Sequence, residues 1–252
     1  MADPLISEDA LFGGRVRLFQ PARGFGYRAN VDAILLGAFA AQGRRVRLAV
    51  DLGSGVGAIG LTLLHLGAAE RVEFIERDPR LAELCQRNLV ANGHAPRGRA
   101  RVGDLERPLA SIAPELVHVA GLVVANPPYV APQRDGRASH TALRSSRLEG
   151  RKGELAPFIR AAADALGRRG RVCLVYPAHA LLELTTAARS AGLEPKRMRF
   201  VHGTATRPAR VVLLELASGK PGGLAVLPPL VETDGAHRPT PELAKILERP
   251  SA

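Results

Sequence analysis

The chain has 252 residues, and its hydrophobic content of 46% is ample for one large packed α/β domain. No apolar run approaches the roughly 20 residues that span a bilayer, the acidic start lacks a signal-peptide pattern, and no Cys or His pair has metal-ligand spacing. The net charge of +11 comes from 35 Lys and Arg against 24 Asp and Glu, and its meaning depends on where the basic residues cluster. We therefore expect a cytoplasmic protein without a metal or a membrane partner.

The first forty residues are punctuated by glycine. Gly14–Phe19 is strand-like, and a helix is expected over Ala33–Ala41, with Asp32 as a candidate N-cap. We expect residues 1–42 to form an extension that packs on a main domain of residues 43–220, followed by a tail of residues 221–252.

A glycine-rich turn follows the first strand of the main domain. The strand, Val46–Asp51, ends in a carboxylate, and the apolar helix Ile59–Leu66 comes after the turn. Glycine permits positive φ and lets a ligand approach the backbone closely, which a Cβ would block. The glycines expected to bind a ligand are Gly53, Gly55 and Gly57.

The same turn also fits the dinucleotide fingerprint, because Gly55, Gly57 and Gly60 have the spacing Gly-x-Gly-x-x-Gly. Asp51 argues against a nicotinamide or flavin cofactor, since its carboxylate ends the strand where a pyrophosphate would sit. A carboxylate repels phosphate but suits the ammonium group of an amino acid. We therefore interpret Asp51 as part of a site for a ligand with an amino-acid end.

The second strand also ends in an acidic residue. Arg71–Glu76 is predicted as a strand, and Asp78 with Pro79 marks the start of the next helix. Glu76 lies 25 residues after Asp51, close to the distance at which an acidic side chain takes ribose hydroxyls in such folds. Because capping already explains Asp78, Glu76 is our candidate for that role.

A short third strand is expected over Arg101–Asp104. Asp104 is placed to accept a hydrogen bond from an adenine amino group. The alternative is that Asp104 is a turn or cap residue before Pro108.

The fourth strand, Gly121–Ala125, runs into Asn126-Pro127-Pro128-Tyr129. Proline has no N–H for a ladder and disfavours helix before it, so pairing stops there. The Asn126 side-chain oxygen and the Pro127 carbonyl can accept both hydrogens of a planar –NH2 group, and Tyr129 can stack on the ring that carries it. We therefore predict a catalytic role for these three residues, with Asn126 also beside the cofactor. The alternative is a strand-ending turn with a core tyrosine.

A long arginine-rich loop follows, with Asp135 and Glu149 as its acids. Such a loop beside the expected catalytic edge favours nucleic acid over a solvated face. The residues expected to bind RNA are Arg134, Arg137, Arg144, Arg147, Arg151 and Lys152. Further basic clusters occupy 97–101, 168–171 and 196–199, and for 168–171 a solvated face is the preferred interpretation.

The remaining chain continues an alternating pattern that predicts an α/β fold, a doubly wound sheet of about seven strands whose last two form an antiparallel, hairpin-like edge. The expected elements are the helices Leu155–Leu166 and Ala178–Ala191 and the strands Arg171–Tyr176, Arg197–Val201 and Arg210–Leu216.

Two of these motifs resemble those of known enzymes. Asn-Pro-Pro-Tyr at 126–129 resembles the motif of S-adenosylmethionine-dependent methyltransferases that modify amino groups on a ring or carbonyl. Asp51-Leu-Gly-Ser-Gly-Val-Gly57 resembles the first motif of class I methyltransferases, whose seven-stranded Rossmann-like sheet has an antiparallel last strand.

A closer resemblance is to the bacterial tRNA adenine-N6 methyltransferases that act on the valine tRNA anticodon loop. The segments that carry it are Gly26–Phe39, Ser145–Glu149, Arg207–Glu215 and Leu230–Glu242, although Leu148 replaces a His or Tyr and arginine and proline replace a tyrosine region of the tail. The resemblance implies S-adenosylmethionine as cofactor and RNA, with tRNA favoured, as substrate. It also implies that Asp32 faces the methionine end of the cofactor and that Tyr27 and Arg28 line the same mouth.

Three alternatives remain. Glutamine-N5 methyltransferases of release factors share the Asn-Pro-Pro-Tyr motif but carry a sizeable helical domain in front. Guanine-N2 rRNA methyltransferases more often have phenylalanine at the fourth motif position. A non-enzymatic RNA-binding module would explain the arginines but leave Asp51, Glu76 and Asn126 unexplained.

Overall fold

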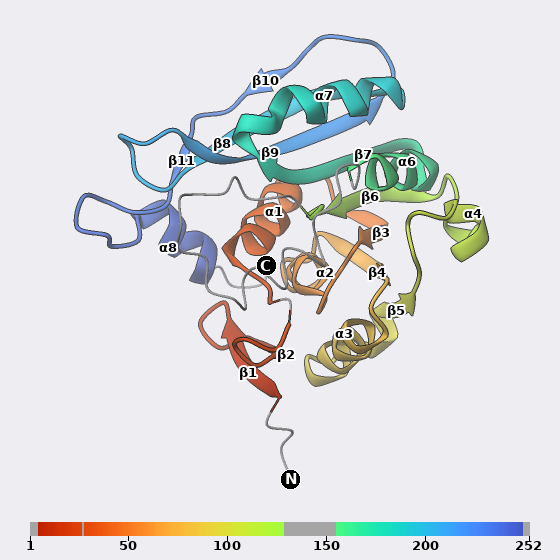
Figure 1. Cartoon of the computed structure of the whole chain (residues 1–252), viewed down its shortest axis with the longest axis horizontal. Coiled ribbons are helices and arrows are strands. Elements are labelled where there is room, and N and C mark those ends of the chain that lie inside the picture. The colour runs from red at the N-terminus through yellow and green to blue at the C-terminus, as the bar shows by residue number, and fades with distance from the viewer. Residues whose placement is uncertain (1–4, 27, 129–154, 249–252) are drawn as a thin grey trace.

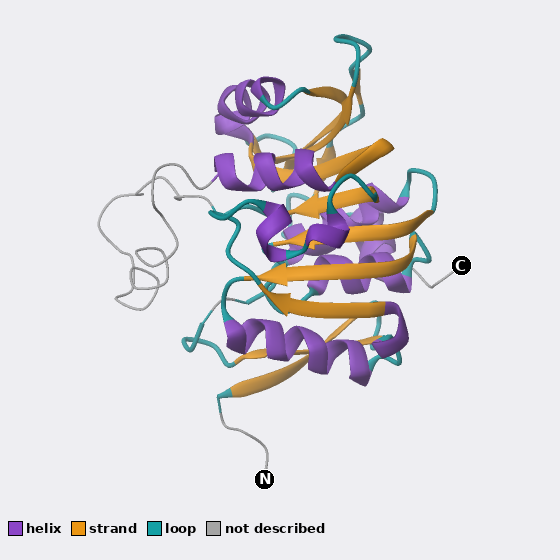
Figure 2. Cartoon of the chain, turned by 90° about the vertical axis from the view of Figure 1, so that its right-hand side faces the viewer, coloured by secondary structure: helices purple, strands orange, loops and turns teal. Residues whose placement is uncertain are grey.

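The computed structural model describes residues 5–26, 28–128 and 155–248. A nine-stranded sheet forms its centre, with helices against both faces (Figures 1 and 2). The α/β class expected from the sequence is confirmed.

The sheet has the order β10-β8-β9-β7-β6-β3-β4-β5, with β11 paired to β8. Strands β3 to β7 are mutually parallel, and β9 runs antiparallel to both β7 and β8, between which it lies. The strands are β3 Val46–Leu52, β4 Ala69–Glu76, β5 Gly98–Val102, β6 Ala120–Ala125, β7 Leu166–Pro177, β8 Leu193–His202, β9 Ala209–Ser218, β10 Ala225–Val226 and β11 Leu230–Val231.

The helices connect these strands. They are α1 Val31–Ala41, α2 Ala58–His65, α3 Pro79–Ala91, α4 Leu109–Ile112, α6 Leu155–Ala165, α7 Leu181–Ser190 and α8 Pro241–Glu248, with 3-10 turns at Ala95–Arg97, Pro114–Leu116 and Ala178–Ala180.

The structure differs from the sequence prediction mainly at element ends. The third strand, β5, ends at Val102, so Asp104 stands beyond it. Strand β7 begins at Leu166 and includes the glycines at 167 and 170 that predicted a turn. Helix α1 begins at Val31 with Asn30 as its N-cap, so Asp32 is not the cap that the sequence suggested.

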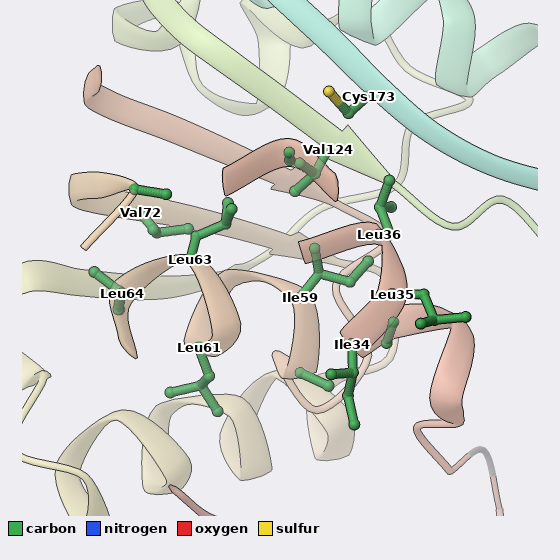
Figure 3. Packing of buried hydrophobic residues seen from close by; sticks show 14 of the residues in the cluster. Ile34, Leu35, Leu36, Ile59, Leu61, Leu63, Leu64, Val72, Val124 and Cys173 are labelled. Carbon is green, nitrogen blue, oxygen red and sulfur yellow. The ribbon is translucent and has the colours of Figure 1, made fainter. Parts of the chain in front are cut away.

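Side chains alternate between two apolar clusters on opposite faces of the sheet, because successive strand residues point to opposite sides. One cluster includes α1, α2 and α3, and the other includes α4, α6 and α7. Figure 3 shows Leu36, Ile59 and Val124, from α1, α2 and β6, gathered in the first cluster. A Cβ on Gly37 of α1 would lie 2.4 Å from Thr62 Cγ2, so this glycine lets α1 and α2 approach closely.

An antiparallel hairpin, β1 (Ile6–Leu11) and β2 (Val16–Pro21), precedes α1 and docks on α3. Asn88 Oδ1 accepts from Phe19 N at 2.6 Å, and Asn88 Nδ2 donates to Phe19 O at 2.9 Å. Asn92, one turn later, makes the same pair of bonds with Arg17 at 2.8 Å each. The two amides on one face of α3 thus hydrogen-bond β2 as a neighbouring strand would.

Asn88 is fully buried and also donates to Val56 O, at 3.0 Å, in the glycine-rich turn. Replacing it by Ala would leave three backbone groups without their partner. We expect Asn88→Ala to lower the free energy of unfolding by about 2–5 kcal/mol in urea titrations. Asn92→Ala, at a half-buried site, should cost about 1 kcal/mol. Equal losses in the two variants would contradict the role assigned to Asn88.

Candidate functional site

The carboxyl ends of β3, β4 and β6 meet around one pocket of about 260 Å³. Ligands bind at this edge in open α/β sheets. The pocket is lined by Asn30, Gly53, Gly55, Glu76, Arg77, Leu81, Asn126, Pro127, Pro128 and Phe158.

The glycine-rich turn forms the floor of the pocket and is fixed through its backbone. Gly53 N donates to Ile75 O at 2.8 Å, and Gly55 N donates to Glu76 Oε2 at 2.7 Å. Gly53, Gly55 and Gly57 have φ values of 64°, 55° and 87°, a region that favours glycine. The backbone conformation therefore favours glycine at these three positions in its own right, in addition to the ligand role predicted for them.

Asp51 lies behind the turn and is fully buried. Its Oδ2 accepts from Gly60 N at 2.9 Å, and its Oδ1 has no hydrogen-bond partner among the described residues. Burial raises the pKa of Asp51 to about 8, since desolvation disfavours the charged form. Asp51 is absent from the residues that line the pocket, so its predicted contact with a ligand stays a prediction.

Glu76 lies at the end of β4 and lines the pocket, although it is mostly buried. Its Oε2 binds Gly55 N, and its Oε1 accepts from Asp78 N at 2.9 Å. Burial raises the pKa of Glu76, while these backbone donors oppose the shift. Asp78 instead caps α3 through Arg80 N, as the sequence indicated.

A second cavity of about 60 Å³ adjoins the pocket beyond β4, and Asp104 lines it. Asp104 Oδ1 also accepts from Glu106 N at 3.0 Å, so Asp104 is a turn residue, and its role toward an adenine amino group stays a prediction. Phe158 of α6 lines both cavities, and a Cβ on Gly53 would lie 2.6 Å from its ring. Sequence reasoning missed Phe158, because nothing local to α6 indicates that its aromatic ring meets the glycine-rich turn.

Asn126 and Pro127 line the pocket directly after β6. Tyr129, the arginine-rich loop from Arg134 to Lys152, and Tyr27 lie outside the described residues, so their predicted roles stay predictions.

Arg28 and Asp32 are engaged by the protein itself and are not among the lining residues. Arg28 donates to Ser7 Oγ, Pro21 O and Asp9 Oδ2, which ties the chain after β2 to the hairpin. Asp32 is 1% exposed and pairs with Arg210. The neighbouring residue that lines the pocket is Asn30.

Several arginines of the basic clusters are structural. Arg171, expected on a solvated face, is buried and donates to Ala40 O and Arg44 O at 3.1 and 2.9 Å. Arg197 pairs with Glu215 at 2.9 Å, and Arg101 pairs with Glu73 at 2.6 Å. Exposed arginines such as Arg168 and Arg169 remain in these clusters.

Among the described residues no group of three or more His, Cys, Asp or Glu is arranged to hold a metal ion. Cys85 and Cys173 are buried free thiols, as expected. The helices in the described ranges include none long and apolar enough to cross a membrane.

Known proteins resemble this chain in sequence and in fold. The model of the methyltransferase small domain family matches residues 30–186. A tRNA1(Val) (adenine(37)-N6)-methyltransferase of Porphyromonas gingivalis (strain ATCC BAA-308 / W83) is 29% identical over 237 residues, covering 89% of each chain. One of the same description from Edwardsiella ictaluri (strain 93-146) is 29% identical over 187 residues, covering 74% of this chain and 72% of its own.

Solved structures share the fold. A predicted O-methyltransferase from Agrobacterium tumefaciens has a TM-score of 0.66 at 24% identity, over 87% of this chain and 97% of its own. A putative RNA methyltransferase from Pyrococcus horikoshii has a TM-score of 0.56 at 17% identity, over 80% and 91%. The chain therefore belongs to the methyltransferase small domain family, and its fold is that of the class I S-adenosylmethionine-dependent enzymes.

Proposed function

We propose that this enzyme transfers a methyl group from S-adenosylmethionine to N6 of an adenine in RNA, within a tRNA anticodon loop. The observation that carries the proposal is the position of Asn126 and Pro127, which line the same pocket as Glu76 and the glycine-rich turn. Relatives that span most of the chain and are described as tRNA adenine-N6 methyltransferases support the substrate. A tRNA substrate would place the activity in the cytoplasm.

The residues present fit S-adenosylmethionine. Glu76 offers carboxylate oxygens to ribose hydroxyls, and Asp104 in the adjoining cavity suits an adenine amino group. Gly53 and Gly55 line the pocket with backbone alone, which a ligand can approach closely. When bound, S-adenosylmethionine supplies an electrophilic methyl group on a sulfonium centre.

The adenine amino group is a poor nucleophile because its lone pair is delocalised into the ring. Asn126 Oδ1 and Pro127 O would accept its two hydrogens, which favours a pyramidal nitrogen with the lone pair turned toward the methyl group. Such alignment of reactants can contribute about 7–11 kcal/mol to the lowering of the barrier. Tyr129 would stack on the base once it has left its own stack.

A glutamine-N5 transfer to release factors would use the same Asn126 chemistry. Relatives that span most of this chain are instead described as tRNA adenine-N6 methyltransferases. The overall charge of +11 also favours a polyanion.

The cofactor assignment predicts that the protein binds S-adenosylmethionine in calorimetric titration without added metal and does not bind NADH. Glu76→Ala should weaken this binding by at least about tenfold, because it removes both the ribose acceptor and the support of Gly55. Glu73→Gln is the matched control, since Glu73 is a buried acid of the same strand that pairs with Arg101 away from the pocket. Unchanged affinity in folded Glu76→Ala would refute the assignment.

The mechanism predicts that Asn126→Ala retains cofactor binding and loses about 10²–10³-fold in single-turnover methyl transfer, because its hydrogen bond matters chiefly in the transition state. Asn126→Asp keeps an acceptor oxygen at the same place and should retain more activity than the Ala variant. A near-normal rate in Asn126→Ala would rule out the proposed activation of the amino group.

The substrate assignment predicts that affinity for a tRNA anticodon stem-loop falls with salt, by a log–log slope of roughly −0.7 per phosphate neutralised on single strands. Charge reversal at Arg144, Arg147 and Arg151 should flatten this slope. The control reverses three exposed arginines near the amino ends of β3 and β7, Arg47, Arg168 and Arg169. Labelled methyl should appear as N6-methyladenosine, and label found in release factor but not in RNA would establish the alternative substrate.

A further inference from the structure

Asn30 is a polar pocket-lining residue that the proposed chemistry has not used. It is the N-cap of α1, yet its side chain makes no capping hydrogen bond. Its Nδ2 instead donates to Asp32 Oδ2 at 3.3 Å. Because a carboxylate can face only the –NH2 end of an amide, the carbonyl Oδ1 of Asn30 points away from Asp32. Within the described ranges no donor reaches that oxygen, so it is an acceptor available to a ligand.

The carboxylate that orients Asn30 is itself held on its other side. Asp32 is 1% exposed, and Arg210 at the start of β9 donates Nη1 to its Oδ2 at 2.9 Å and Nη2 to its Oδ1 at 2.6 Å. A bidentate pair of this kind fixes both the position and the plane of the carboxylate. Arg210 therefore determines where Asp32 can offer an oxygen to Asn30.

The C-terminal tail completes the arrangement. Glu232 binds Arg210 through Nε at 3.1 Å and Nη2 at 2.7 Å. The backbone bond from Glu232 N to His202 O anchors this part of the tail on β8, and the bond from Thr240 N to Glu232 O joins two parts of the tail itself. A continuous series of contacts, Glu232–Arg210–Asp32–Asn30, thus runs from the tail to the pocket. Its two carboxylates and one guanidinium leave a net charge of −1 behind the Asn30 amide.

The sheet order indicates which part of the cofactor would meet Asn30. If adenine lies beside Asp104 after β5 and ribose beside Glu76 at the end of β4, the amino-acid end extends past β3 toward β6. Helix α1, which Asn30 begins, packs on α2, β6 and β7, on that same side. An amide oxygen backed by negative charge is a suitable acceptor for an ammonium group.

We propose that Asn30 Oδ1 binds the ammonium group of S-adenosylmethionine, and that Asp32, Arg210 and Glu232 are positioning residues that orient it. Through Glu232, the tail thereby contributes to the affinity for the amino-acid end of the cofactor. This inference rests on the proposed cofactor but not on the proposed RNA substrate.

The test is calorimetric titration without RNA, using S-adenosylmethionine and 5′-methylthioadenosine, which lacks the amino-acid end. Asn30→Ala should weaken binding of S-adenosylmethionine about tenfold, the usual effect of losing a hydrogen bond to a charged group, and leave 5′-methylthioadenosine unchanged. An equal loss for both ligands, or no loss for either, would overturn the contact.

The positioning residues are tested in the same way. Arg210→Gln should reproduce the selective loss, and combining it with Asn30→Ala should add little, because both changes remove the same contact. If Arg210→Gln does not fold without the Asp32–Arg210 pair, the double variant Asp32→Asn/Arg210→Gln removes both charges and should show the same selectivity. Glu232→Gln should give a smaller loss of the same kind.

Arg238→Gln is the matched control, since Arg238 forms an exposed ion pair with Asp234 in the same tail and should not affect either ligand. Fully additive losses, or unchanged affinity in folded Arg210 variants, would overturn the positioning role. A protein that binds S-adenosylmethionine with this selectivity but methylates no RNA would refute the substrate assignment while supporting the inference drawn here.

Discussion

The site depends on how the glycine-rich turn after β3 is held by its neighbours. Its backbone is bound by the end of β4 through Ile75 O and the Glu76 carboxylate, and by Asn88 of α3 through Val56 O. Left-handed glycine conformations give the turn its shape, but these contacts select one shape among the many that glycine permits. A ligand therefore meets a backbone surface that is already formed, which lowers the entropic cost of binding.

The same polar groups that support the fold also support the site. Glu76 uses both carboxylate oxygens on backbone donors and still faces the pocket, and Asn88 binds the N-terminal hairpin together with the turn. Buried polar groups of this kind are stabilising only when they are fully satisfied. Around the turn, this satisfaction is incomplete at one oxygen of the Asp51 carboxylate and at the Ser54 hydroxyl, which lack a hydrogen-bond partner in the described ranges. The burial of Asp51 beneath the turn accounts for its raised pKa.

Much of this could be predicted from the sequence, because the strand ends carry their chemistry locally. The alternation of strands and helices along the chain, the pocket positions of Glu76 and Asn126, and the capping role of Asp78 followed from patterns within a few residues. Contacts between distant segments did not. Phe158 reaches the turn from α6, Arg210 meets Asp32 across 178 positions, and Arg171 is buried against α1 and β9. A polar or aromatic side chain gives no local sign of a partner so far along the chain. In the sequence, an arginine that is buried in the core therefore looks the same as one that is exposed on the surface.

The position of β9 has a consequence for how the chain is completed. Strand β8 is synthesised before β9 but hydrogen-bonds to the main sheet only through it, because β9 lies between β7 and β8. During translation, β8 must wait for the later strand to be inserted before it can join the sheet. The arriving strand also brings Arg210 to Asp32. Closure of the sheet and pairing of Asp32 with Arg210 thus wait for the same segment, so a nascent chain that ends before β9 lacks both.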